Sequence, residues 1–286
     1  MLHRVALGLL FAGSLTLGFL ACGDDPAGGP GTGSDAGTID GYDGGGNVDS
    51  GPIIIQRLDE TKQTGRIVRA ESSDVPIEGA TITIGSNAAV SGAGGTYEIV
   101  APRNSRYRMS VTAPGFLKLI EQEWTVNAES FERGDTALLT TQSAGLIADL
   151  LSPPRDTAKG MILVRVSAVA PCDSEEGATV SVDPPGNARV AYFGGQLPDR
   201  SLKSVQKGAA FSALVYDVDP GVEVKVVVTS PRCQQVTPHE TGGARYTNVQ
   251  IVEAGDVLAY VRAFLRDPPD GGASDAGADA DADAGP

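Results

Sequence analysis

Three cysteines carry the chemistry that this sequence shows most directly. They are Cys22, Cys172 and Cys233 in a chain of 286 residues. A thiol can form a disulfide, bind a metal or carry a covalent group, and an odd number of cysteines in an exported protein leaves one without a disulfide partner. The role of each cysteine therefore depends on whether the chain is exported and on which thiol stays unpaired.

The N-terminus has the three parts of an export signal. His3 and Arg4 form a short basic start, and an almost unbroken apolar run follows over residues 5–20. Ala21 is a small residue of the kind that signal peptidases accept. The run is shorter than the ~20 residues of a membrane-spanning helix, and glycine- and aspartate-rich sequence follows it. We therefore predict a signal peptide over residues 1–21.

The end of this signal resembles the lipobox of bacterial lipoproteins, in the segment Phe19-Leu20-Ala21-Cys22. The family pattern is Leu, a small residue, Gly or Ala, then Cys, so Ala21 and Cys22 match it while Phe19 and Leu20 depart. The resemblance implies that Cys22 receives a diacylglyceryl group and, after cleavage, an acyl group such as palmitate. Two or more buried acyl chains anchor a protein stably. The alternative is an ordinary signal peptide or an uncleaved anchor in which Cys22 is incidental.

Lipidation of Cys22 leaves Cys172 and Cys233 as a pair. Compartments beyond the inner membrane are oxidising, so we predict a disulfide between these two residues. Closing a loop of about 60 residues stabilises a fold by roughly 4 kcal/mol in the chain-entropy model. The alternative is two separate buried thiols.

The negative charge of the chain is concentrated in its two ends. The formal net charge is −14, yet residues 23–52 and 267–286 each contain six Asp and no Lys or Arg. The middle, residues 53–266, is therefore close to neutral, at about −3. Both ends are too poor in large apolar residues to form a core, and we predict disorder in them. Nucleic-acid binding is not expected, because it requires a concentrated basic face.

Signatures of catalysis or metal binding are absent from the sequence. His239 is the only histidine after the predicted cleavage site, and its Pro- and Gly-flanked segment predicts a surface loop. Neither H-E-x-x-H nor G-x-S-x-G occurs. The tail over residues 279–285 resembles half of a calcium loop, but Ala284 stands where an EF-hand requires Gly, so a solvated spacer is the better interpretation. We expect no catalytic residue, no cofactor and no metal.

Trp124 is the only tryptophan and lies among polar residues, in Glu121-Gln122-Glu123-Trp124-Thr125. Two interpretations are open. An exposed indole is a platform on which a sugar ring can stack, whereas a buried one packs in the core or at a sheet edge, which is the commoner case. Trp124 is therefore a possible ligand contact.

Alternation of apolar and polar residues indicates half-buried β-strands, as over 106–113 and 222–228. Gly and Pro separate these runs, and Pro114-Gly115 suits a type II turn. One helix is predicted, about Ser143 to Leu151, and the proline pair Pro153-Pro154 ends it. Many short strands between turn signals are typical of sandwiches or barrels.

Part of the strand pattern occurs twice. Gly79-Ala80-Thr81-Ile82-Thr83-Ile84 reappears 98 positions later as Gly177-Ala178-Thr179-Val180-Ser181-Val182. An earlier strand opened by glycine, at Gly65 and at Gly160, precedes each copy. Two copies of one module explain this pattern, and chance similarity among valine-rich strands is the alternative. Gly79 and Gly177 are predicted to allow a bend or a positive φ before a buried strand.

The first copy resembles the carboxypeptidase regulatory-like domain, a transthyretin-like Greek-key sandwich, over about residues 62–142. The resemblance implies only the accessory domain of that peptidase family, because the zinc ligands of the peptidase domain are missing. Transthyretin-like sandwiches are also similar to starch-binding modules. The matching segments, in order, are Gly65-Arg66-Ile67-Val68, Pro76-Ile77-Glu78-Gly79-Ala80-Thr81-Ile82, Gly94-Gly95-Thr96-Tyr97-Glu98-Ile99, Tyr107-Arg108-Met109-Ser110-Val111 and Pro114-Gly115-Phe116.

These observations predict an all-β chain with two tandem Greek-key β-sandwich domains, transthyretin-like or Ig-like. The expected function is that of a non-enzymatic, lipid-anchored envelope protein with a structural or adhesive role, in the outer membrane of a Gram-negative bacterium with its bulk in the periplasm or at the cell surface. Its expected partners are the membrane and an envelope protein or glycan, and the alternative function is carbohydrate binding. The predicted segments are the signal peptide 1–21, a disordered tether 22–56, a first sandwich 57–142, a connector with a short helix 143–157, a second related sandwich 158–266 and a disordered tail 267–286.

Overall fold

The computed structural model describes residues 59–209 and 211–267, which belong to one compact unit of the chain. The predicted signal peptide, the predicted tether 22–56 and nearly all of the acidic tail lie outside the described residues. Cys22 and the segment 279–285 lie there too, so their predicted roles stay predictions. Within the described part the fold is all-β apart from one α-helix and one short 3-10 helix, η1 (Ala93–Gly95).

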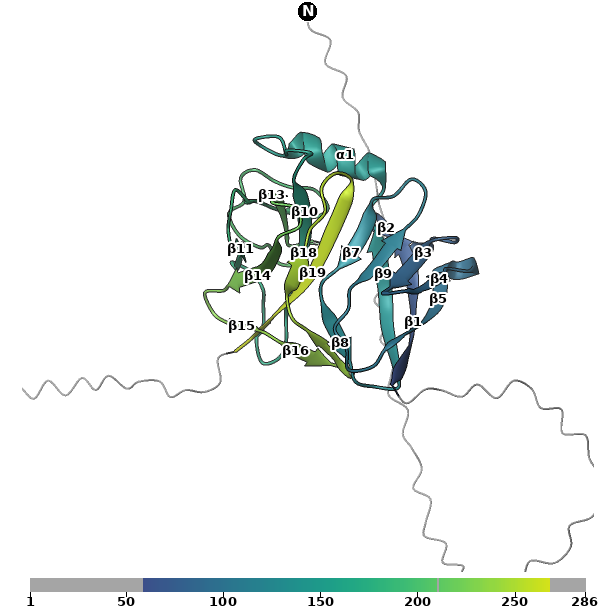
Figure 1. Cartoon of the computed structure of the whole chain (residues 1–286). Coiled ribbons are helices and arrows are strands. Elements are labelled where there is room, and N and C mark those ends of the chain that lie inside the picture. The colour runs from purple at the N-terminus through teal and green to yellow at the C-terminus, as the bar shows by residue number, and fades with distance from the viewer. Residues whose placement is uncertain (1–58, 210, 268–286) are drawn as a thin grey trace, which may run out of the picture. The chain divides into compact units, whose positions relative to one another are not determined.

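The largest sheet has nine strands and runs through both predicted sandwiches. Its strand order is β12-β13-β10-β19-β7-β6-β3-β4, and β15 pairs with β19 in addition. At its centre β19 lies between β10 and β7, and it is parallel to both (Figure 1). The strands are β3 (Thr81–Ile84), β4 (Asn87–Val90), β6 (Met109–Thr112), β7 (Lys118–Glu121), β10 (Gly160–Ala168), β12 (Arg189–Tyr192), β13 (Ala213–Val218), β15 (Gln234–Val236) and β19 (Val257–Arg266).

Three smaller sheets complete the described structure. In the four-stranded sheet, β1 pairs with β2 and β5 antiparallel and with β9 parallel. The other two are three-stranded, with the orders β11-β14-β18 and β16-β17-β8. The strands are β1 (Glu60–Arg69), β2 (Ser72–Pro76), β5 (Thr96–Pro102), β8 (Trp124–Val126), β9 (Ser130–Leu138), β11 (Thr179–Asp183), β14 (Glu223–Thr229), β16 (His239–Thr241), β17 (Ala244–Tyr246) and β18 (Val249–Ile251).

The two sandwiches share four strand pairings. We call β1 to β9 the first sandwich and β10 to β19 the second. In the first, β1 lies between antiparallel β5 and parallel β9, and β6 pairs with β3 and β7. In the second, β10 lies between antiparallel β13 and parallel β19, and β14 pairs with β11 and β18. Gly79 and Gly177, the glycines of the repeated motif, have φ values of 77° and 81°, as the sequence predicted. The repeat is therefore structural as well as sequential.

Two strand pairs join the sandwiches to each other. Parallel β7 and β19 place Leu119 opposite Leu258, and antiparallel β8 and β17 place Trp124 opposite Tyr246. The ion pair between Lys118 and Glu253, with 2.7 Å between Nζ and Oε2, adds a contact next to the first of these junctions. The sandwiches are thus interlocked through backbone hydrogen bonds.

The buried residues form two clusters, one on each face of the nine-stranded sheet. One cluster fills the first sandwich and continues beneath the helix to Leu163 and Leu258 of the second. The other lies between the nine-stranded sheet and β11-β14-β18 and includes Ile162 and Val164. Because successive side chains of β10 enter different clusters, this strand is apolar on both faces, which explains its unbroken Met161-Ile162-Leu163-Val164 run.

The single helix, α1 (Thr141–Leu150), closely matches the predicted 143–151. It begins at Thr140, whose hydroxyl accepts a hydrogen bond from the Ser143 N–H as an N-cap. Glu71 accepts hydrogen bonds from the hydroxyl and the N–H of Thr140, which fixes this end of α1. Ile147 is its buried residue. No helix in the described ranges is long and apolar enough to cross a membrane.

Candidate functional site

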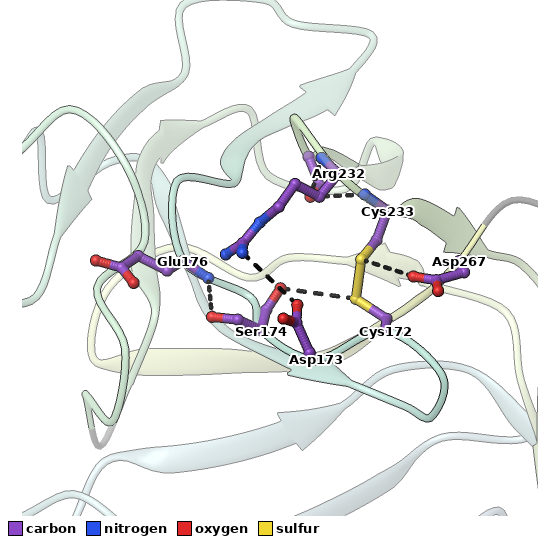
Figure 2. The surroundings of a disulfide bond; sticks show 8 residues. Cys172, Asp173, Ser174, Glu176, Arg232, Cys233 and Asp267 are labelled. Carbon is purple, nitrogen blue, oxygen red and sulfur yellow. Dashed lines mark hydrogen bonds and ion pairs between the residues drawn. A yellow bond between two sulfur atoms is a disulfide. The ribbon is translucent and has the colours of Figure 1, made fainter.

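Cys172 and Cys233 form a disulfide in the second sandwich, with their Cα atoms 6.1 Å apart (Figure 2). Cys172 follows β10 and Cys233 precedes β15, so the bond ties two loops separated by 61 positions. Both residues are buried. The predicted pairing is confirmed, and the alternative of two separate thiols is wrong.

The surroundings of the disulfide do not form a metal centre. Asp267 lies 3.5 Å from Cys233 Sγ, and together with the two sulfurs it is the only group of three possible metal ligands within residues 59–209 and 211–267. The sulfurs are bonded to each other, so neither is the thiolate that binds a metal. Arg232 and Asp173 form an ion pair of 3.7 Å beside the bond (Figure 2). The role of this region is structural.

Trp124 lies in the core between the two sandwiches and is completely buried. Its ring stacks on Tyr246 of β17 at 5.9 Å between centroids with nearly parallel planes, and Tyr107 meets it edge-on at 5.2 Å. The Arg133 guanidinium lies over the indole, 3.7 Å from its centroid. The exposed sugar-stacking platform is therefore not formed, which corrects that interpretation in favour of core packing. Alternation in β8 explains the burial, because Trp124 and Val126 face inward while Thr125 faces out.

A buried ion pair joins Arg133 of β9 to Glu121 of β7 beside this tryptophan. Their side chains are 3% and 5% exposed, and burial lowers the pKa of Arg133. Burial also raises the pKa of the neighbouring Tyr97 and Tyr107 hydroxyls. Removing either partner would leave an uncompensated charge in the core, so both side chains of the pair are needed for β7 and β9 to pack as they do. The alternation Phe131, Glu132, Arg133 in β9 is the sequence signal that places Arg133 inside.

His239 is buried, and the surface loop predicted for it is wrong. It begins β16 and stacks on Phe264 of β19, with the ring centroids 3.7 Å apart. Burial lowers its pKa, and the nearby charge of Arg266 lowers it further. The prediction failed because the Pro238 and Gly242 around His239 indicate turns, while the strand between them is only three residues long.

A hollow of about 640 Å³ is lined by residues of β8 and of the β16–β17 hairpin. Its walls are polar and come from both sandwiches, with Asn104 and Asn127 from the first and Glu240 and Arg245 from the second. Glu240 and Arg245 pair with each other at 3.7 Å. No aromatic side chain lines this hollow, so it offers no surface for sugar stacking.

No protein-family model matches the sequence, and no curated protein matches it at a significant level. Among solved structures, the Bacillus anthracis TIE protein aligns with 72% of this chain and 34% of its own length, at 10% identity and a TM-score of 0.23. GBS52, the minor pilin of Streptococcus agalactiae, aligns over 73% of this chain and 97% of its own, at 10% identity and a TM-score of 0.21. The shaft pilin SpaA from Lactobacillus rhamnosus GG aligns over 74% and 98%, at 8% identity and a TM-score of 0.22. The β-sandwich fold rests on the strand pairing itself, and the carboxypeptidase regulatory-like resemblance stays an interpretation of short motifs.

Proposed function

We propose that this chain is an exported, lipid-anchored and non-enzymatic protein of the bacterial envelope that displays an interlocked pair of β-sandwiches. The observation that carries the proposal is the disulfide between Cys172 and Cys233. Cytosolic thiols are kept reduced, so a structural disulfide belongs in an oxidising compartment such as the periplasm or the cell surface. The disulfide thus supports the proposed export through the segment 1–21, which leaves Cys22 as the cysteine for the lipid.

The interlocked fold supports a structural or adhesive role. Two sandwiches joined only by a linker move relative to each other, whereas β7–β19 and β8–β17 link these two by backbone hydrogen bonds. A body of this kind keeps binding surfaces on both sandwiches in a fixed geometry. We propose that the glycine- and aspartate-rich segment 23–52 separates this body from the membrane, since 30 flexible residues span roughly 30 Å. The outer membrane of a Gram-negative bacterium is the proposed site.

Carbohydrate binding is not retained as a second proposal. It rested on an exposed Trp124, and that side chain is in the core. His239, the single histidine of the described part of the chain, is packed against Phe264.

Lipidation is tested by expressing the full chain in a Gram-negative host fed with labelled palmitate. The wild-type protein is expected to carry label and to fractionate with membranes. Cys22→Ala is expected to lose the label and the membrane association. The matched control is Cys172→Ala with Cys233→Ala, which removes two cysteines and keeps the label. Equal labelling of wild type and Cys22→Ala, or no labelling of either, would refute the proposal.

A further inference from the structure

Two arginines lie side by side on the central strands of the nine-stranded sheet. Arg165 of β10 and Arg262 of β19 are direct partners in the parallel register. Paired residues of adjacent strands project from the same face, and neighbouring strands are only ~4.8 Å apart. Two like charges are therefore held together by the backbone, and such a pair is destabilising without a counter-charge.

The carboxylates that line the same hollow as this arginine pair are already paired with other groups. Both arginines line a small hollow of about 80 Å³ that also includes Glu121 and Asp135. Glu121 pairs with Arg133, and Asp135 pairs with Arg66 at 2.6 Å. Neither Arg165 nor Arg262 has a side-chain hydrogen bond or an ion pair to a residue of 59–209 or 211–267. The hollow therefore has an uncompensated positive charge.

The shape of the hollow limits what can neutralise this charge. Its volume of about 80 Å³ suits a small group. Phe211 and Tyr260 form apolar walls, and Leu119 and Leu163 also line it, while Arg165 is exposed and Arg262 is half-buried. Charge-assisted hydrogen bonds from guanidinium groups to a planar or tetrahedral oxoanion are strong.

We propose that Arg165 and Arg262 form a binding site for an oxoanion, either a carboxylate or a phosphoryl group. This site would give the proposed envelope protein a ligand. The proposal of the site does not depend on lipid anchoring. The oxoanion has two possible sources. One is a free or partner-borne group, and the other is the chain's own tail, whose Asp residues over 270–283 lie 8 to 21 positions after Arg262.

The site is tested by thermal unfolding of the full-length protein in sodium phosphate against sodium chloride at constant ionic strength. Phosphate is expected to raise the wild-type unfolding midpoint by a few degrees and to saturate, because a ligand that binds only the folded state stabilises it. Arg165→Gln and Arg262→Gln are each expected to lose most of this shift. In chloride, both variants are expected to unfold at a midpoint equal to or above wild type, because the like-charge contact is gone. A merely structural arginine would lower it.

Two further variants make the outcomes distinct. Lys225→Gln removes one exposed positive charge from β14, outside the hollow, and is expected to keep the full phosphate shift. Replacing the five Asp residues of 270–283 by Asn in the full chain separates the two sources. A shift that is larger in this variant than in wild type assigns the site to the tail, and an unchanged shift assigns it to an external oxoanion. Two outcomes would overturn the proposal. In one, phosphate raises the unfolding midpoint of every variant equally, including Arg262→Gln. In the other, phosphate raises the midpoint of neither the wild type nor the Asn-tail variant.

Discussion

Removing the disulfide from the second sandwich should destabilise the first as well, if the strand pairs between them transmit stability. The change is Cys172→Ala with Cys233→Ala. Opening a loop of 61 positions costs about 4 kcal/mol in the chain-entropy model. At the m-values of ~4 kcal/mol/M usual for guanidinium chloride, this corresponds to a fall of about 1 M in the unfolding midpoint.

The assay uses Trp124, the only tryptophan of the chain, as a reporter in the first sandwich. Its strand β8 pairs with β17, and its ring stacks on Tyr246, so it loses its environment when the junction opens. Guanidinium unfolding followed by tryptophan fluorescence and by far-UV circular dichroism should give one transition by both probes, shifted by the same amount. Cys22→Ala is the control and should leave the midpoint unchanged.

Independent sandwiches would give a different result. In the double variant, circular dichroism would then show two separate transitions, an early one for the second sandwich and a later one for the first at its wild-type midpoint. The fluorescence of Trp124 would follow the early transition, because Tyr246 unfolds with the second sandwich. That outcome would refute the reasoning that β7–β19 and β8–β17 make one cooperative unit.

Three further predictions concern stability. Gly95 has a φ of 74°, and a Cβ there would lie 2.3 Å from a backbone oxygen of β1. Gly95→Ala should therefore cost more than ~2 kcal/mol in chemical unfolding, because the clash adds to the strain of an unfavourable φ. Gly85→Ala has a positive φ but open space and should cost only about 1 kcal/mol, and equal losses would contradict the clash. Glu121→Gln should lose about 3 kcal/mol because it leaves the buried Arg133 without a counter-charge, and a loss under 1 kcal/mol would show that the pair is solvated. Burial lowers the pKa of His239 from its ordinary 6.5, so on acidification the unfolded chain binds a proton before the folded one does, and the free energy of unfolding falls as the pH drops below 6.5. His239→Gln should flatten that part of the plot of stability against pH. An unchanged plot would contradict the burial of His239.

The sequence predicted the features that depend on local pattern. Alternation at 222–228 became β14, Gly79 took a positive φ, and the helix near Ser143 formed. These succeed because strand periodicity and helix-stopping prolines act within a few residues. The start of α1 lay two residues earlier than predicted, because the capping role of Thr140 was not recognised.

The features that depend on pairing between distant strands were not predicted. Nothing local in Lys118–Glu121 indicates that β7 pairs with β19, which is far along the chain. The burial of Trp124 follows from its pairing with Tyr246, so polar neighbours in the sequence were a misleading signal. The side-by-side position of Arg165 and Arg262 also arises only from the register of β10 and β19.

The most direct test of the central proposal is mass spectrometry of the N-terminal peptide from membrane-extracted protein. Arg57 is the first basic residue after Cys22, so trypsin is expected to release residues 22–57 as one peptide. We predict that this peptide begins at Cys22 and carries the mass of a diacylglyceryl group and an acyl chain. A peptide that begins elsewhere, or one with an unmodified Cys22, would contradict lipid anchoring at this residue.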